Sequence, residues 1–257
     1  MRGRWVPLSR PRRLIVEYVQ FAKSMPIVAV EKRMQLGALV TARDGCAERP
    51  SWVAIFLKAY AIVAQECPDL RRAYVKLPWP HLYEHPVSIG GFTVNREFRG
   101  ESAVFQIPVT DPAVLPLSEL HGIVRHGQTA PLDEVRMIRL ALLLGGLPWP
   151  LRRAISWIGL NIGFARASAL GTFGVTTITS LGAWSLHTLS PMPGMVTFGT
   201  IDGDGGVTLR FFWDHRIMDG VAVADALGRL ETVLATRIAD ELRQRAPPAT
   251  ERRTRIG

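Results

Sequence analysis

Residues 211–220 read Phe-Phe-Trp-Asp-His-Arg-Ile-Met-Asp-Gly, and the rest of the chain is best interpreted outward from this stretch. Three aromatic residues lead into His215, which has a charged residue on either side. Four positions later Asp219-Gly220 marks a turn, because glycine tolerates positive φ and aspartate bonds its local backbone. Residues 221–242 then place apolar side chains at helical spacing. The pattern predicts a buried strand ending at His215, a turn and an amphipathic helix, and such a strand end can hold a general base rigidly.

Other segments predict a sheet with helices. A helix over residues 52–66 has Ser51 as its expected N-cap and is apolar nearly all round, which indicates burial. Further elements follow from periodicity and turn residues: strands at 87–98 and 102–109, a helix at 115–127, and strands at 173–178, 195–201 and 207–213. Residues 14–42 mix helix and strand signals, with Leu14-Ile15-Val16 and Met25 to Val30 prone to form strands. Residues 77–86 are expected to form a proline-rich loop.

Three segments together resemble one known family. The run Asp214-His215-Arg216-x-x-Asp219-Gly220 resembles the active-site signature of the 2-oxo-acid dehydrogenase acyltransferase catalytic domains, members of the chloramphenicol-acetyltransferase-like superfamily. Residues 177–182, TITSLG, resemble the family's T-I-S-[SN]-L-G strand. Ser190-Pro191 and residues 196–199 resemble its threonine-proline and I-L-G segments, in the right order. The resemblance implies an α+β, chloramphenicol-acetyltransferase-like two-layer fold: a mixed sheet with helices packed on one face.

The net charge of +9 comes from the two ends of the chain. Residues 1–13 hold five arginines and no acid, and residues 243–257 hold five arginines and one glutamate. We expect both ends to be basic disordered tails around a catalytic domain at 14–242. A nucleic-acid-binding domain would carry its basic stripe on the folded body, so no nucleic-acid partner is expected. Weak attraction of the tails to a membrane surface is compatible with this composition.

Cysteine and histidine usage predicts neither a disulfide framework nor a metal site. Cys46 and Cys67 have no metal-ligand spacing, and reduced thiols suit a cytoplasmic protein. His81 and His85 stand four apart, but the prolines around them argue against a shared helix and no third ligand is evident. No secretory signal and no uncharged apolar run long enough for a membrane span is visible. We therefore expect a cytoplasmic protein, with peripheral membrane attachment as an alternative.

Residues 135–163 depart from the resembled family. They predict two short apolar helices, separated by Gly145-Gly146 and by Pro148-Trp149-Pro150. Three interpretations of this hydrophobic insert (137–163) remain open: a helical hairpin that covers the sheet, a lining or lid for an acyl-chain tunnel, or an interfacial membrane anchor.

The resemblance implies acyl transfer from a thioester. His215 is the candidate base, because imidazole exchanges its proton in the physiological range. The family's oxyanion-stabilising hydroxyl falls at Thr179, with Ser180 in reserve although a strand would point it to the opposite face. Asp219 is expected to support the loop through an ion pair with an arginine. Asp214 and Arg216, with Ser180, are the expected substrate-side contacts that fix the histidine's surroundings.

The expected protein is a stand-alone acyltransferase without a bound cofactor. Acyl-CoA or an acyl-carrier thioester would be the co-substrate, and a thiol, hydroxyl or amine the acceptor. The resemblance also implies a homotrimer in which the equivalents of His215 and Thr179 meet across a subunit interface. The alternative is a non-catalytic scaffold or binding subunit of the same fold, with or without attachment to a membrane surface.

Overall fold

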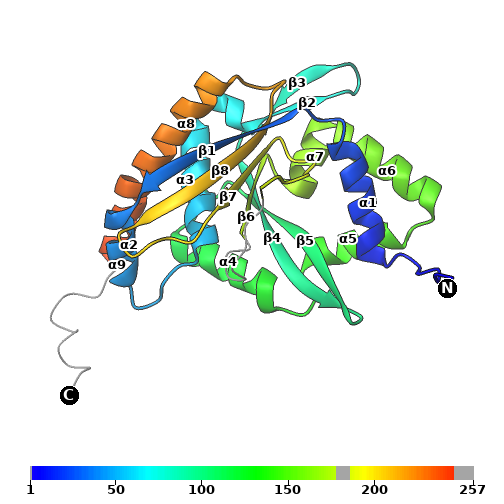
Figure 1. Cartoon of the computed structure of the whole chain (residues 1–257), viewed down its shortest axis with the longest axis horizontal. Coiled ribbons are helices and arrows are strands. Elements are labelled where there is room, and N and C mark those ends of the chain that lie inside the picture. Colours follow the sequence, from blue (N-terminus) through cyan, green and yellow to red (C-terminus); the bar gives the residue numbers. More distant parts are fainter. Residues whose placement is uncertain (1, 178–185, 246–257) are drawn as a thin grey trace.

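Strand β8 (Gly206–Asp214) and helix α8 (Gly220–Val233) form where the aromatic run and the Asp-Gly turn predict them. The computed structural model describes residues 2–177 and 186–245. In it β8 lies inside a mixed sheet, ordered β1-β8-β7-β6-β4-β5 (Figure 1). The other strands of this sheet are β1 (Ile27–Gln35), β4 (Ile89–Phe98), β5 (Glu101–Thr110), β6 (Phe173–Thr176) and β7 (Gly194–Phe198).

The sheet combines both strand directions. Strand β6 pairs in parallel with β4 and with β7, whereas β1–β8, β7–β8 and β4–β5 are antiparallel. The hairpin β4–β5 turns at Arg99-Gly100, where both residues have positive φ, as a tight hairpin turn requires. Two short strands, β2 (Arg72–Val75) and β3 (His81–Glu84), form a separate antiparallel pair. The α+β mixed-sheet class expected from the sequence is confirmed.

Helix α3 (Trp52–Glu66) fills the centre of the main helical layer. Ser51 caps it, because its hydroxyl accepts a hydrogen bond from the Ala54 amide at 3.3 Å. The helix is buried nearly all round, as predicted, and the ring of its Tyr60 stacks on Phe173 of the sheet. The same layer contains α8 and four further helical segments: α2 (Gly37–Asp44), α4 (Leu117–Thr129), a π-helical turn at Leu234–Ile238 and α9 (Ala239–Arg245).

A second group of helices contacts part of the opposite face of the sheet. Along β8, Phe211 and Trp213 join the core around α3, while Phe212 points the other way and packs with Leu160 and Leu170. The helices on this side are α1 (Arg10–Ala22), α6 (Trp149–Asn161) and α7 (Gly163–Leu170), while α5 (Arg136–Gly146) packs against α1 and adds Ile138 to the core around α3. Figure 1 shows α1, α5 and α6 gathered at the end of the molecule where the N-terminus lies.

Four segments differ from the sequence-based expectation. Residues 14–16 are helical, because Ser9 caps α1 and Pro11 suits its first turn, so the last four residues of the expected N-terminal tail belong to a helix. Residues 243–245 of the expected C-terminal tail end α9. Strand β3 lies within the expected proline-rich loop. Helix α7 follows the two helices predicted for the insert.

Among the described residues, no helix combines the length and apolarity that crossing a membrane requires.

Candidate active site

The loop after β8 is anchored to the strands on both sides of it. The Asp214 amide donates to the Pro193 carbonyl at 2.9 Å, and the His215 amide donates to the Pro26 carbonyl at 3.0 Å. Pro193 immediately precedes β7, and Pro26 immediately precedes β1. Because both neighbouring strands hold its backbone, His215 starts from a fixed position at the sheet edge.

The His215 side chain is oriented by a backbone carbonyl. Its Nδ1 lies 3.2 Å from the Met218 oxygen, which also accepts a hydrogen bond from Trp213 Nε1 at 3.0 Å. A carbonyl oxygen only accepts, so Nδ1 carries the proton in the neutral ring and Nε2 keeps its lone pair. With 48% of the side chain exposed, the ring is accessible to a reactant.

Asp214 and Arg216 form a bidentate pair inside the same loop. Asp214 Oδ1 accepts from the Arg216 amide at 3.1 Å and from its Nε at 2.8 Å, and Oδ2 accepts from Nη2 at 2.5 Å. The Asp214 side chain has 0% exposure. It therefore has no surface to offer a substrate, and the predicted substrate contact is replaced by a structural role. The Arg216 guanidinium, partly exposed, lies over the Tyr74 ring at 4.1 Å.

Among the residues that the structure describes, Asp219 does not make the predicted ion pair with an arginine. Its side chain is 89% exposed, and its Oδ1 lies 3.7 Å from His215 Nδ1. The residue is the N-cap of α8, yet its side chain makes no capping hydrogen bond. Asp219 stands at the start of α8, where its carboxylate lies beside the His215 imidazole. Arg216, the arginine of this loop, is already paired with Asp214.

The sequence reasoning missed Arg166, a buried residue of α7. Its Nε donates to the Pro191 carbonyl at 2.9 Å, and its Nη1 donates to the Tyr74 carbonyl at 3.1 Å. Burial lowers the pKa of Arg166 to about 10, although the nearby Asp214 carboxylate acts in the opposite direction. Arg166 thus ties α7 to the segment before β7 and to the backbone of Tyr74, whose ring contacts Arg216. No local pattern in the sequence around it signals a buried arginine.

Thr179 and Ser180 lie outside the described residues, but the residues on both sides of them line a pocket. This cavity of about 350 Å³ lies between α1 and the sheet face opposite α3. Its polar wall includes Thr176, Thr177 and Thr188, and its apolar wall includes Ile15, Tyr18 and Met195. From the α5–α7 segment the lining residues include only Leu170, so the described part of the chain does not support the insert as a tunnel lining. His215 is not among the lining residues.

Two further predictions concern histidine and cysteine. His81 Nδ1 lies 2.6 Å from the Trp79 carbonyl oxygen, and His85 Nδ1 lies 2.7 Å from that of Val87, so each ring has a backbone partner. Within residues 2–177 and 186–245 no cluster of three or more His, Cys, Asp or Glu side chains could hold a metal ion. Cys46 and Cys67 are thiols that are not joined in a disulfide.

Comparison with solved structures identifies the fold. A probable dihydrolipoamide acetyltransferase from Listeria monocytogenes superposes with a TM-score of 0.62 at 14% identity, covering 96% of this chain and 97% of that one. The dihydrolipoamide acetyltransferase of Azotobacter vinelandii gives 0.59 at 15% identity, covering 93% of each chain. A chloramphenicol acetyltransferase gives 0.50 at 10% identity, covering 89% and 96%.

The chain therefore has the chloramphenicol-acetyltransferase-like fold. Within that fold its structural neighbours are the catalytic domains of dihydrolipoamide acyltransferases, as the sequence motifs predict. At the sequence level no family model and no curated protein matches the chain.

Proposed function

We propose that this protein is an acyltransferase in which His215 is the general base. The observation that carries the proposal is the bond between His215 Nδ1 and the Met218 carbonyl, because it leaves Nε2 as the unprotonated nitrogen on an accessible ring. Nε2 would take the proton from an acceptor thiol, hydroxyl or amine as that group attacks the thioester carbonyl. Collapse of the tetrahedral intermediate would break the carbon–sulfur bond, and the imidazolium would return its proton to the departing thiolate.

The oxyanion of that intermediate needs a hydrogen-bond donor. Thr179 is our candidate, with Ser180 in reserve. The pocket lined by Thr176, Thr177 and Thr188 supports this assignment, since it adjoins the segment that carries both hydroxyls. The thioester, on CoA or on a carrier, is a co-substrate, so the reaction needs no resident cofactor.

The solved neighbours support acyl transfer as the reaction class. All three are named as acetyltransferases, and the Azotobacter study concerns a serine, a histidine and an asparagine in the catalytic mechanism. The asparagine of that enzyme stands four positions after its histidine, which is the spacing of Asp219 from His215. We also propose a homotrimer, which would bring His215 of one subunit to the threonine-lined pocket of the next.

The test is thiol release from acyl-CoAs of increasing chain length, with a thiol acceptor, by the wild-type chain and His215→Ala. The variant should lose about a hundredfold or more in turnover, since positioned acid–base catalysis contributes at least that much. Its unfolding midpoint should match the wild type, because His215 is half exposed. Equal turnover by the wild type and the variant would exclude His215 as the general base. Activity in neither protein, with carrier-bound donors also inert, would favour a non-catalytic scaffold of the same fold.

A further inference from the structure

Two long stretches of the chain contain no acidic residue. The first sixteen residues hold five arginines, and residues 135–201 hold five more, with no aspartate or glutamate in either stretch. The fold brings the two together, because α1 packs against both α5 and α6. Glu17, the first acid of the chain, is enclosed: its side chain is 3% exposed and pairs with Arg152 and Arg153. The α1–α5–α6 surface therefore presents positive charge without exposed carboxylates of its own helices.

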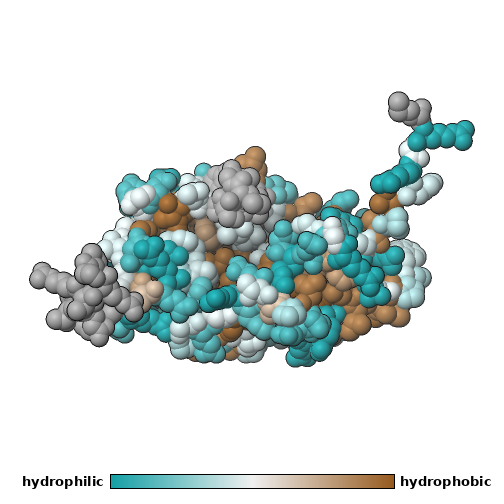
Figure 2. All heavy atoms as spheres, turned by 90° about the horizontal axis from the view of Figure 1, so that it is seen from below, coloured by the Kyte–Doolittle hydropathy of each residue, from teal (hydrophilic) through white to brown (hydrophobic). Residues whose placement is uncertain are grey.

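The outward faces of α5 and α6 are apolar. On α6, Arg152, Ser156 and Leu160 point inward at helical spacing, which leaves Leu151, Ile155 and Ile158 on the outer face at 43–49% exposure. On α5, Leu140 and Leu143 are exposed at 42% and 59%, beside Arg136 and Arg139. Figure 2 shows hydrophobic side chains gathered toward the end of the molecule from which the N-terminal segment projects. Exposed leucine and isoleucine among arginines are typical of helices that lie in a membrane interface.

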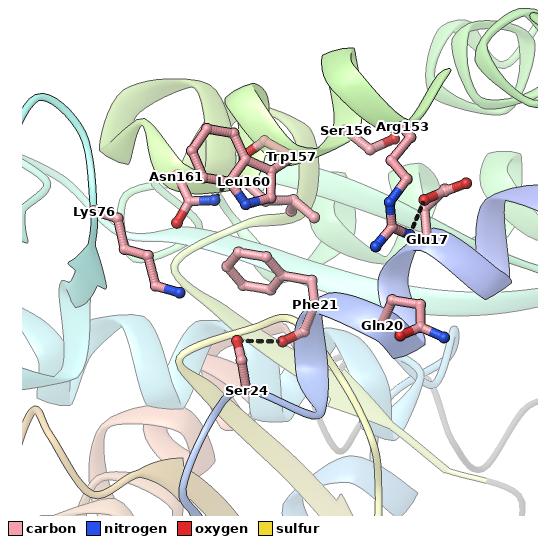
Figure 3. Close-up of a pocket in the computed structure, with 10 residues that line it drawn as sticks. All are labelled: Glu17, Gln20, Phe21, Ser24, Lys76, Arg153, Ser156, Trp157, Leu160 and Asn161. Atoms are coloured by element: carbon pink, nitrogen blue, oxygen red, sulfur yellow. Dashed lines mark hydrogen bonds and ion pairs between the residues drawn. The ribbon is translucent and has the colours of Figure 1, made fainter. Parts of the chain in front are cut away.

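A pocket of about 190 Å³ with polar and apolar walls opens between α1 and the adjoining flank of α6 (Figure 3). Lys76 and Arg153 point toward it from opposite sides, and Phe21 and Trp157 form apolar walls. The Ser156 hydroxyl also lines it, is buried, and has no hydrogen-bond partner in the described part of the chain. A buried hydroxyl without a partner is costly, so a ligand that accepts its hydrogen bond would be favoured. Lys76, Arg153 and the Ser156 hydroxyl suit a phosphate group, while the Glu17 carboxylate, which also lines the pocket, is held by Arg152 and Arg153.

We propose that the α1–α5–α6 surface docks onto an anionic phospholipid bilayer and that this pocket receives a lipid headgroup phosphate. Charge decides the choice of partner. The exposed charges of the three helices are all positive, although Glu101 of β5 pairs with Arg12 beside them. Such a surface favours an oppositely charged partner, and anionic headgroups provide one. The apolar faces of α5 and α6 would enter the acyl boundary while their arginines stay at headgroup level. This inference does not depend on His215 or on acyl transfer.

The experiment is flotation of the full chain with phosphatidylcholine vesicles, with and without phosphatidylglycerol, at low and high salt. The wild type should float only with phosphatidylglycerol and should detach at high salt. Replacing Arg136→Gln and Arg139→Gln together should weaken binding about thirtyfold. The control, Arg237→Gln with Arg243→Gln, removes the same charge from the opposite helical layer and should leave binding unchanged.

A second comparison tests the apolar face and the pocket. Leu151→Ser, Ile155→Ser and Ile158→Ser together should abolish flotation, whereas Leu82→Ser with Val114→Ser, exposed elsewhere, should not. Lys76→Gln should weaken binding to phosphatidylglycerol vesicles. Equal flotation with both lipids, or equal loss in the controls, would overturn the proposal. The proposal would also fail if light scattering showed a different particle mass for the variant with the three serine substitutions, because the apolar face would then be a contact between subunits. The His215→Ala variant should float as the wild type does, so flotation tests membrane binding independently of the proposed acyl transfer.

Discussion

The Nδ1 atom of His215 lies 3.2 Å from the carbonyl oxygen of Met218, three residues further along the same loop. Since the carbonyl can only accept, the neutral imidazole should be protonated at Nδ1. Long-range proton–nitrogen correlation spectra of ¹⁵N-histidine-labelled protein report the tautomer directly. We expect the Nδ1–H form for the resonance that His215→Ala removes. A resonance in the Nε2–H form would place the proton on the nitrogen that the mechanism requires to be free.

Asp219→Asn should have a small effect. The carboxylate is almost fully exposed, so the free energy of unfolding should change by no more than about 0.5 kcal/mol. Its charge near His215 Nδ1 contributes about 1 kcal/mol in a water-like medium, so turnover should fall by about fivefold at most. Urea unfolding and thiol-release rates measure the two quantities. A loss near that of His215→Ala would show that Asp219 acts directly in the reaction.

Asp214→Asn should destabilise the protein strongly. The variant leaves Arg216 without its bidentate partner in a site where the carboxylate has no exposure. Breaking such a pair lowers the free energy of unfolding by about 3 kcal/mol. The loss is measured as a lower midpoint of urea unfolding with an unchanged m-value. The matched control is Asp240→Asn, whose pair with Arg243 is exposed on both sides and should contribute less than about 1 kcal/mol. Similar values for the two variants would contradict the structural role of Asp214.

Tyr60→Phe should stabilise the protein. The Tyr60 hydroxyl is buried and has no hydrogen-bond partner among the residues described, while the ring stack on Phe173 survives the change. We expect a gain of about 1 kcal/mol. Burial also raises the pKa of Tyr60, so the neutral phenol is favoured in the folded state. The contribution of the neutral phenol to wild-type stability is fully present below about pH 10 and falls as the pH rises further, because the phenol then ionises in the unfolded chain. The phenylalanine variant should not show this loss. A less stable variant at neutral pH would reveal a partner for the hydroxyl.

Gly145→Ala should loosen the contact between α1 and α5. A Cβ at Gly145 would lie 2.2 Å from the Arg10 carbonyl oxygen, so the two helices must move apart. Overpacking of this kind costs about 1–3 kcal/mol. Gly122→Ala in α4 meets no atom within 4 Å and should instead stabilise by about 0.5–1 kcal/mol through helix propensity. Thermal unfolding of the two variants should therefore shift in opposite directions, and a shift in the same direction would contradict the close approach.

The parts of the fold that could be predicted share strong local signals. Strand β8 and helix α8 follow from an unbroken aromatic run and an Asp-Gly turn, and Ser51 predicts the N-terminus of α3 as its N-cap. Helix α1 was misjudged because Leu14, Ile15 and Val16 favour strands, and packing against α5 and α6 outweighs that preference. Strand β3 was missed because four residues between prolines give no periodicity.

The candidate site was predictable only where its residues are neighbours in sequence. His215, Asp214 and Arg216 come together within one loop, but the Asp214–Arg216 pair depends on burial, and the prediction gave an ion pair only to Asp219, with an unspecified arginine. Arg166 lies far along the chain from the loop it supports, and its importance arises from what surrounds it after folding. The roles predicted for Thr179 and Ser180 stay predictions.

The position of Arg166 makes helix α7 part of the support of the histidine loop. Helix α7 lies just beyond the predicted insert (137–163), and its Arg166 donates to the carbonyls of Pro191 and Tyr74 in the interior. Deleting α7 would therefore leave these two carbonyls without their donor, next to the segments that hold the histidine loop.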